Sequence, residues 1–260
     1  NARRLGKNSY REWVMIELLT CGLFSFSKEP RRENQDTILP PLLINNGFLI
    51  AVADGVGSYD GAQNASQSAI RELPELVRKG NLQNMTSLFL SLKEGVSSLS
   101  EMNIKFSHAA TTLTFCFVDD EGLHIGHVGD CRLYVKTDSK LKQITKDHTQ
   151  HQKLLDDKIY SKSELKQLPG KNTLTTAIAN AIPLDFQQTF IPHDELLNDR
   201  DEAFVYLMSD GTHAFWEKRP RFSPKTLENP SSFASSLYKR IERAGPIDDH
   251  SLIAVRYRVL

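Results

Sequence analysis

Short apolar segments that end at an aspartate recur three times along the chain. Residues 49–53 lead to Asp54, residues 123–128 to Gly129 and Asp130, and residues 204–209 to Asp210. Each run is short, partly β-branched and bounded by glycine, which predicts buried strands. A strand that ends in Asp-Gly presents one carboxylate beside a lightly shielded backbone. The repetition predicts an acidic site at one edge of a sheet.

Helical spacing of apolar residues appears in three other segments, residues 62–77, 85–99 and 231–243. In the second segment, four apolar residues fall on one helical face at steps of four and three. These are Leu88, Leu92, Val96 and Leu99. Pro74 is expected to limit the continuity of the first helix, and the serines after Pro230 to cap the third.

The remaining pattern is mostly that of strands separated by turns. Residues 16–26 predict one or two early strands, and Asn45-Asn46-Gly47 predicts a hairpin turn before the run to Asp54. An antiparallel meander is expected over residues 111–118, 123–128, 131–136 and 141–144, and a last strand over 251–259. Residues 147–198 are polar and irregular, with weak helical pieces at 152–158 and 161–168. A segment of this length in a compact domain is usually functional.

Composition excludes several classes of protein. The chain has 260 residues, of which 40% are hydrophobic and 25% charged, with 32 basic and 32 acidic residues. This balance predicts a single globular domain over residues 15–260, after a poorly determined leader over residues 1–14. Zero net charge and the lack of a long apolar segment indicate neither nucleic-acid nor membrane binding. Three cysteines without metal-type spacing fit a reducing, cytoplasmic location, and nothing indicates more than a monomer.

Five aspartates occupy strand ends or polar turns: Asp36, Asp54, Asp130, Asp210 and Asp248. If the fold gathers them, their repulsion raises their pKa values unless cations intervene. Oxygen ligands alone select Mg²⁺ or Mn²⁺ over zinc. Two such ions about 3.5–4 Å apart can hold a hydroxide and clamp a phosphate.

Other residues near these aspartates allow two interpretations each. Arg31 offers a planar fork for phosphate oxygens, although a lone arginine is more often a solvated surface residue. His213 and His250 follow Asp210 and Asp248 closely and could act as acids near neutral pH. A histidine in such a place more often lies at the surface or supports the site. A single Asp-Gly is usually a turn, so only the whole set predicts a metal site.

The order of these motifs resembles one family. The motifs are RRENQD (31–36), VADGVG (52–57), ATT (110–112), VGDCR (128–132), TKDHT (145–149), NTLT (172–175), LMSDG (207–211) and DDHSL (248–252). Together they are similar to the successive motifs of type 2C protein phosphatases, the PPM family, in its bacterial form. The likeness runs from about residue 21 to the C-terminus. Each motif alone is short, but eight in the same order are specific.

The resemblance implies an α+β fold, a four-layer α-β-β-α sandwich of two antiparallel sheets flanked by helices. It implies hydrolysis of phosphoserine and phosphothreonine by direct attack of a water or hydroxide that bridges two Mn²⁺ or Mg²⁺ ions. The implied partners are a phosphorylated protein substrate and the serine/threonine kinase whose work is reversed.

By position, the resemblance also assigns roles to residues. Asp36, Asp54, Asp210 and Asp248 become the catalytic metal site, with the Gly55 carbonyl as a further ligand. Asp130 joins Asp210 at a third, weaker ion, and Arg31 binds the substrate phosphate. Residues 147–182 include a variable flap beside the site.

Two departures from the family pattern matter. Gln35 stands where many members have a glutamate ligand, and Val56 where animal members have a histidine proposed as general acid. Two alternatives therefore stay open: a catalytically quiet module of this fold that binds a phosphoprotein or regulator, and a phosphatase for a small metabolite or nucleotide. Without the resemblance, the residues predict only a metal-dependent hydrolase of phosphate esters.

Overall fold

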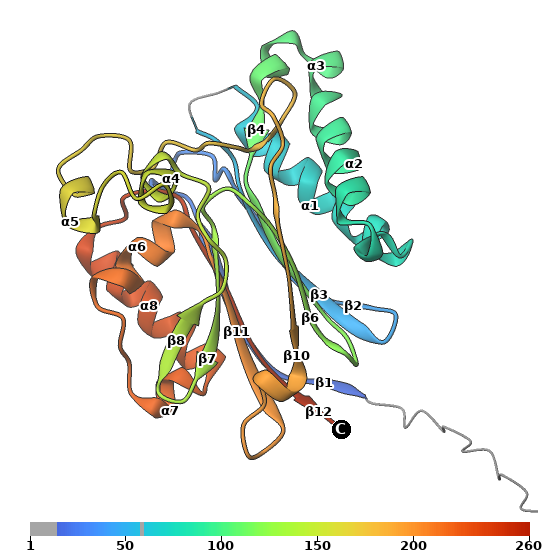
Figure 1. Ribbon diagram of the computed structural model, residues 1–260, viewed down its shortest axis with the longest axis vertical. Coiled ribbons are helices and arrows are strands. Elements are labelled where there is room, and N and C mark those ends of the chain that lie inside the picture. Colours follow the sequence, from blue (N-terminus) through green and yellow to red (C-terminus); the bar gives the residue numbers. More distant parts are fainter. Residues whose placement is uncertain (1–14, 58–59) are drawn as a thin grey trace, which may run out of the picture.

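The computed structural model describes residues 15–57 and 60–260, and the leader at residues 1–14 lies outside them. Two antiparallel sheets are stacked face to face, with helices on both outer sides (Figure 1). In spatial order, sheet A contains β1 (Ile16–Phe26), β12 (His250–Val259), β11 (Glu202–Met208), β7 (Arg132–Thr137) and β8 (Lys140–Gln143). Sheet B contains β10 (Gln187–Pro192), β6 (Gly122–Val128), β5 (Leu113–Val118), β3 (Gly47–Asp54) and β2 (Asp36–Ile44). The expected α-β-β-α sandwich is confirmed.

Helices cover the outer face of each sheet. Sheet B is covered by α1 (Ala62–Arg78) and α2 (Met85–Ser97), followed by α3 (Leu99–Met102). Sheet A is covered by α6 (Asp210–Lys218), α7 (Pro224–Leu227) and α8 (Pro230–Ala244). Short 3₁₀ turns occur at η1 (Asn81–Gln83), η2 (Ile104–His108) and η3 (His193–Glu195). In the described part of the chain, no helix is long and apolar enough to cross a membrane.

Strand β3 shows why the run to Asp54 is continuously apolar. Its alternate residues Leu49, Ala51 and Ala53 pack under α1 and α2. Phe48, Ile50 and Val52 face sheet A. Because successive side chains of a strand point to opposite faces, a strand between two layers must be apolar throughout. The core thus places Asp54 at the edge of the sandwich.

Several predicted boundaries were wrong. Helix α1 runs through Pro74, which is buried with Leu73 and Val77 in the face that packs on sheet B. Helix α2 ends at Ser97 rather than at residue 99. The cap of α8 is Asn229, whose side chain accepts from the Ser232 amide, and not a serine.

Several elements were not predicted, among them β2, β10 and α6. Strand β2 carries two prolines, β10 is an edge strand with alternating exposure, and α6 begins at Asp210 itself. The flap region, residues 147–182, contains α4 (Gln150–Asp156), α5 (Lys162–Leu165) and β9 (Ile178–Ala179), which pairs with β4 (Ala110–Thr111). It lies at the same end of the sandwich as the start of α6 (Figure 1).

Candidate metal centre

The fold brings the five predicted aspartates to one edge of the sandwich. Asp36 and Asp54 are directly paired across β2 and β3. Asp210 begins α6 at the end of β11, and Asp130 and Asp248 lie in loops next to β6 and β12. The carboxylate of Asp54 is repelled by the other four, which places all of them within electrostatic range of it.

Burial and mutual repulsion raise the pKa values of four of these carboxyl groups. Burial raises the pKa of Asp36 to about 7, with Asp210 and Asp249 adding to it and hydrogen bonds from Ser251 and Ser209 opposing it. Burial, then Asp248, raises the pKa of Asp210 to about 6. The pKa values of Asp54 and Asp130 rise well above the usual range, again mainly through burial. The edge therefore holds more negative charge than the fold alone neutralises.

The oxygens present fit a hard divalent cation. One carboxylate oxygen of Asp36 and one of Asp210 are buried and accept no hydrogen bond within the described residues. A buried acceptor without a partner is costly, and a cation would satisfy it. Among the residues that the structure describes, no three acidic, histidine or cysteine side chains already converge as a set of metal ligands.

Ser209 and Asp249 hold the backbone around Asp36. The Ser209 hydroxyl donates to Asp36 Oδ2 at 2.7 Å and accepts from the Ser251 amide at 2.9 Å. The buried Asp249 carboxylate accepts from the backbone amides of Lys28 at 2.8 Å and Gln35 at 2.7 Å. The loop before β2 is thus tied to the start of β12. The sequence pattern did not predict this role of Asp249.

The two arginines of the first motif differ in their surroundings. Arg31 is exposed and makes no hydrogen bond or ion pair with any residue that the structure describes. Arg32 instead donates to Gln35 Oε1 at 2.6 Å and lies 3.9 Å from Asp248 and 3.8 Å from Asp249. The structure therefore places Arg32 against the acidic edge and leaves the Arg31 guanidinium available. Asp248, with a side chain 52% exposed, is the outermost of the aspartates.

Gly55 packs too tightly for any other residue. An added Cβ would lie 2.4 Å from the Ala62 carbonyl oxygen and 3.0 Å from that of Gln35. Its amide donates to the Gln35 carbonyl at 3.1 Å. This close approach is enough to explain why position 55 is a glycine, whether or not its carbonyl binds a metal. The predicted role of the Gly55 carbonyl as a metal ligand therefore stays a prediction.

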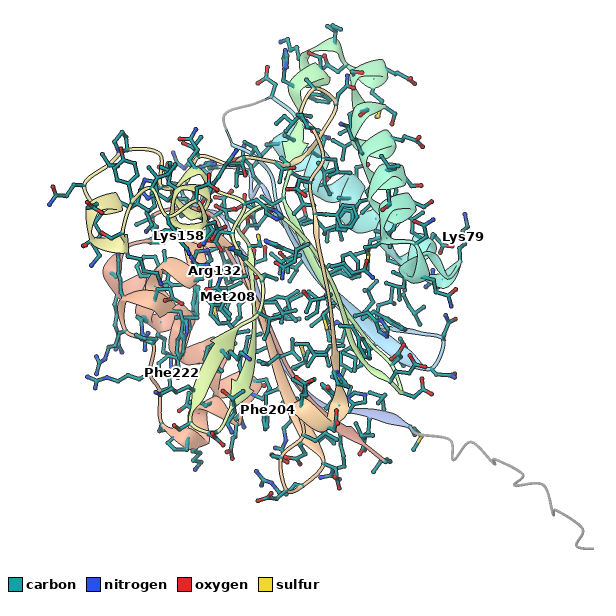
Figure 2. All side chains as sticks on the ribbon, in the orientation of Figure 1. Lys79, Arg132, Lys158, Phe204, Met208 and Phe222 are labelled. Atoms are coloured by element: carbon teal, nitrogen blue, oxygen red, sulfur yellow. The ribbon has the colours of Figure 1, made fainter. Side chains whose placement is uncertain are left out.

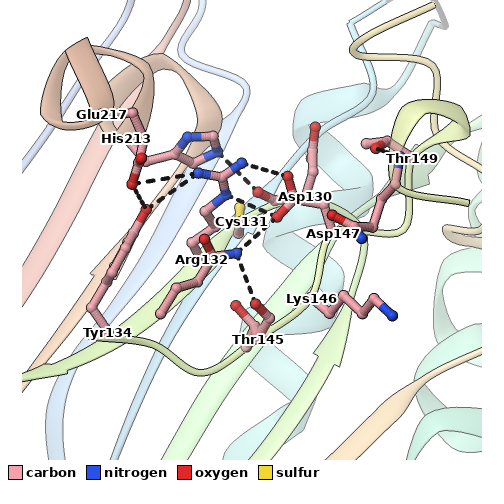
Figure 3. A network of polar contacts seen from close by, with 12 residues as sticks. Asp130, Cys131, Arg132, Tyr134, Thr145, Lys146, Asp147, Thr149, His213 and Glu217 are labelled. Carbon is pink, nitrogen blue, oxygen red and sulfur yellow. Dashed lines mark hydrogen bonds and ion pairs between the residues drawn. The ribbon is translucent and has the colours of Figure 1, made fainter. Parts of the chain in front are cut away.

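A partly buried polar network supports Asp130 from the side of sheet A (Figure 3). Arg132 donates to both carboxylate oxygens of Asp147, at 2.8 and 2.7 Å. His213 Nε2 lies 3.1 Å from the Asp130 carbonyl oxygen. Burial, followed by the charge of Arg132, lowers the pKa of His213 to about 3, so the imidazole is neutral near pH 7. This state does not suit His213 as a general acid.

His148 and Thr175 anchor the flap region beside Asp130. The His148 amide donates to the Gly129 carbonyl at 2.7 Å, and the Gly129 amide donates to His148 Nδ1 at 3.0 Å. The Thr175 amide donates to the His148 carbonyl at 2.9 Å. Gly129 has a φ of 104°, which favours glycine.

Comparison with known proteins agrees with this architecture. The family model described as protein phosphatase 2C matches residues 31–254. A putative protein phosphatase of Mycoplasma genitalium is 27% identical over 82% of this chain and 86% of its own length. The serine/threonine protein phosphatase PstP of Mycobacterium tuberculosis is 30% identical over 57% of this chain, and the match spans only 29% of PstP.

Solved structures share the fold at low identity. The serine/threonine phosphatase Stp1 of Staphylococcus aureus superposes with a TM-score of 0.75 at 17% identity, covering 98% of both chains. The phosphatase PstP/Ppp of Mycobacterium tuberculosis gives 0.71 at 22% identity, covering 93% of this chain and 98% of the other. With the family model matched over most of its length, the chain belongs to the protein phosphatase 2C family and is a phosphoprotein phosphatase of the bacterial type.

Proposed function

We propose that the chain hydrolyses phosphoserine and phosphothreonine on proteins with two Mn²⁺ or Mg²⁺ ions. Asp36, Asp54, Asp210 and Asp248 would hold the ions, together with the Gly55 carbonyl. Asp130 would hold a third, weaker ion with Asp210. The observation that carries the proposal is the gathering of buried carboxylates that repel one another and keep unpartnered oxygens.

When bound, two such ions supply an activated water as nucleophile and neutralise the charge that develops on the phosphate. The chain's own residues would orient the metal ligands and bind the substrate phosphate. Ser209 holds Asp36 through its 2.7 Å hydrogen bond. The exposed Arg31 guanidinium offers two parallel donors to phosphate oxygens. Val56 has no ionisable group and His213 is neutral near pH 7, so neither would protonate the leaving hydroxyl, and a water at the site would take that role.

The proposal extends to the setting of the enzyme. A serine/threonine kinase would supply the phosphorylated substrate, and the chain would act as a monomer in the cytoplasm. Cys21, Cys116 and Cys131 are free thiols, which fits a reducing compartment. The quiet binding module is the rival, and the retention of all five aspartates argues against it.

The test is phosphate release from a phosphothreonine peptide with Mn²⁺, with Mg²⁺ and with chelator. Turnover should need the metal, and Asp210→Asn should lower kcat/KM by at least roughly 100-fold, because a ligand is lost. Asp120→Asn, in an exposed turn, is the matched control. Lack of turnover on the peptide and on para-nitrophenyl phosphate, with metal binding verified by calorimetry, would refute the enzyme and favour the binding module.

A further inference from the structure

A basic cleft lies between the C-terminal half of α8 and the segment that follows α6. Its volume is about 690 Å³. Five cationic side chains line it: Arg219, Arg221, Lys239, Arg240 and Arg243. Among the described residues that line the cleft, none is acidic. The chain has no net charge, so this is a local concentration of positive charge.

Arg240 builds the floor of the basic cleft. Its guanidinium donates to the carbonyl oxygens of Arg219 at 2.7 Å and Arg221 at 3.2 Å, and lies 4.3 Å from the ring centre of Phe222. These contacts hold the segment after α6 against α8. Burial, and then the charge of Arg219, lowers the pKa of Arg240. The cations therefore repel one another, and a bound anion would relieve that repulsion.

The other four cations are free to bind. The side chains of Arg219, Arg221, Lys239 and Arg243 are exposed, and none forms a hydrogen bond or ion pair with the described part of the chain. A cation near the end of a helix offsets the helix dipole, which accounts for Arg243 at the end of α8. It does not account for Arg221, which lies beyond the end of α6.

Acidic residues on the same helices are engaged elsewhere. Glu217 accepts from the Tyr134 hydroxyl at 2.9 Å. Glu242 lies 4.0 Å from His250. The fold thus directs its own carboxylates away from the cleft, so the positive charge stays open to a ligand.

The basic cleft is close to the aspartates along the chain. Arg243 precedes Asp248 by five residues, so their Cα atoms are at most about 18 Å apart. Arg219 follows Asp210 by nine residues, mostly along α6, which places it roughly 14 Å away. An extended peptide covers such distances with about four to six residues.

We propose that the basic cleft binds an acidic segment of the phosphoprotein substrate, about four to six residues from the phosphorylated one. The arginines match carboxylates because their planar guanidinium groups donate two parallel hydrogen bonds. The inference rests on the proposed function for the phosphate itself. Contact with the acidic segment is independent of turnover.

The test compares two phosphothreonine peptides that differ only in a Glu₄ or Gln₄ segment, placed four to six residues before or after the phosphothreonine. For the wild type at low salt, the better-placed acidic peptide should have a KM about 5- to 20-fold lower, with little change in kcat. High salt should remove this difference because exposed charges are screened. The triple variant Arg221→Gln, Lys239→Gln, Arg243→Gln should remove it at low salt.

A matched control removes the same charge from the opposite side of the molecule. Arg71, Lys79 and Lys105 are exposed on the helical layer over sheet B, and Figure 2 shows Lys79 far from Phe222. The variant with glutamine at these three positions should keep the preference for the acidic peptide. Both triple variants should hydrolyse para-nitrophenyl phosphate like the wild type, which also shows that they fold.

Equal KM values for the two peptides at every placement, or an equal loss of preference in both triple variants, would overturn the inference. If the proposed phosphatase function itself is wrong, the protein will turn over no substrate at all, which is a different result from equal KM values. In that case anisotropy of a fluorescein-labelled Glu₄ peptide without phosphate decides. Binding that weakens several-fold in the cleft variant alone supports the inference, and lack of binding to the wild type refutes it.

Discussion

The substitution Asp36→Asn should stabilise the metal-free protein, and more at pH 8 than at pH 5. Asp36 is 5% exposed, and burial raises its pKa from 3.8 to about 7. Because the folded state holds the proton more tightly than the unfolded state, this contribution to stability is complete below about pH 4. It is lost as the pH rises through 7. Asparagine carries no charge at any pH, so the variant does not lose this stability as the pH rises.

The magnitude follows from the pKa difference. With 1.36 kcal/mol per pKa unit, the full cost of ionising Asp36 in the fold is (7 − 3.8) × 1.36, about 4 kcal/mol. At pH 5 the cost is smaller, (5 − 3.8) × 1.36, roughly 1–2 kcal/mol. The advantage of asparagine should therefore grow by about 3 kcal/mol between pH 5 and pH 8.

Urea unfolding with chelator, followed by circular dichroism at both pH values, measures this difference. Asp156→Asn is the matched control because its pKa is lowered, mainly by the hydrogen bond from Lys146 at 2.6 Å, and the lysine stays charged from pH 5 to pH 8. That substitution should destabilise the protein equally at pH 5 and pH 8, since both lie above the unfolded pKa. A change in unfolding free energy for Asp36→Asn that is the same at both pH values would refute the reasoning.

Two further predictions concern the support of Asp130. Asp147→Ala should lower the unfolding free energy by about 1.5–3 kcal/mol, because it removes both charge-assisted hydrogen bonds of the partly buried Arg132 and leaves Glu217, 3.6 Å away, as its acidic partner. A loss below about 0.5 kcal/mol in urea unfolding would show that the pair behaves like an exposed one. Gly129→Ala should cost about 2–4 kcal/mol, since its φ is 104° and the new Cβ would lie 2.4 Å from the Thr112 side chain. Gly80→Ala is the control for backbone strain alone, because Gly80 has a φ of 79° and an added Cβ there would meet nothing within 4 Å. Equal losses of stability in thermal unfolding of the two variants would contradict the predicted clash with Thr112.

Local patterns in the sequence determined the elements whose neighbours lie close along the chain or on one continuous face. Leu88, Leu92 and Val96 are fully or almost fully buried, as their helical spacing predicted. The hairpin at Asn45 and Asn46 pairs Ile44 with Gly47. The motif order also indicated the family and its sandwich fold. These features depend on periodicity and turn chemistry, which a short stretch of residues carries by itself.

Only the tertiary structure decided features that depend on distant partners. Strand β10 has three polar residues followed by three apolar ones, without alternation, and forms because it pairs with β6. Nothing local shows that Asp249 turns inward to the Gln35 amide, 214 residues away, while Asp248 stays exposed. The basic cleft likewise forms only because Arg240 holds the segment after α6 against α8. Long-range hydrogen bonds and packing choose among side-chain positions that the sequence leaves equally open, so the gathering of charge is a property of the fold.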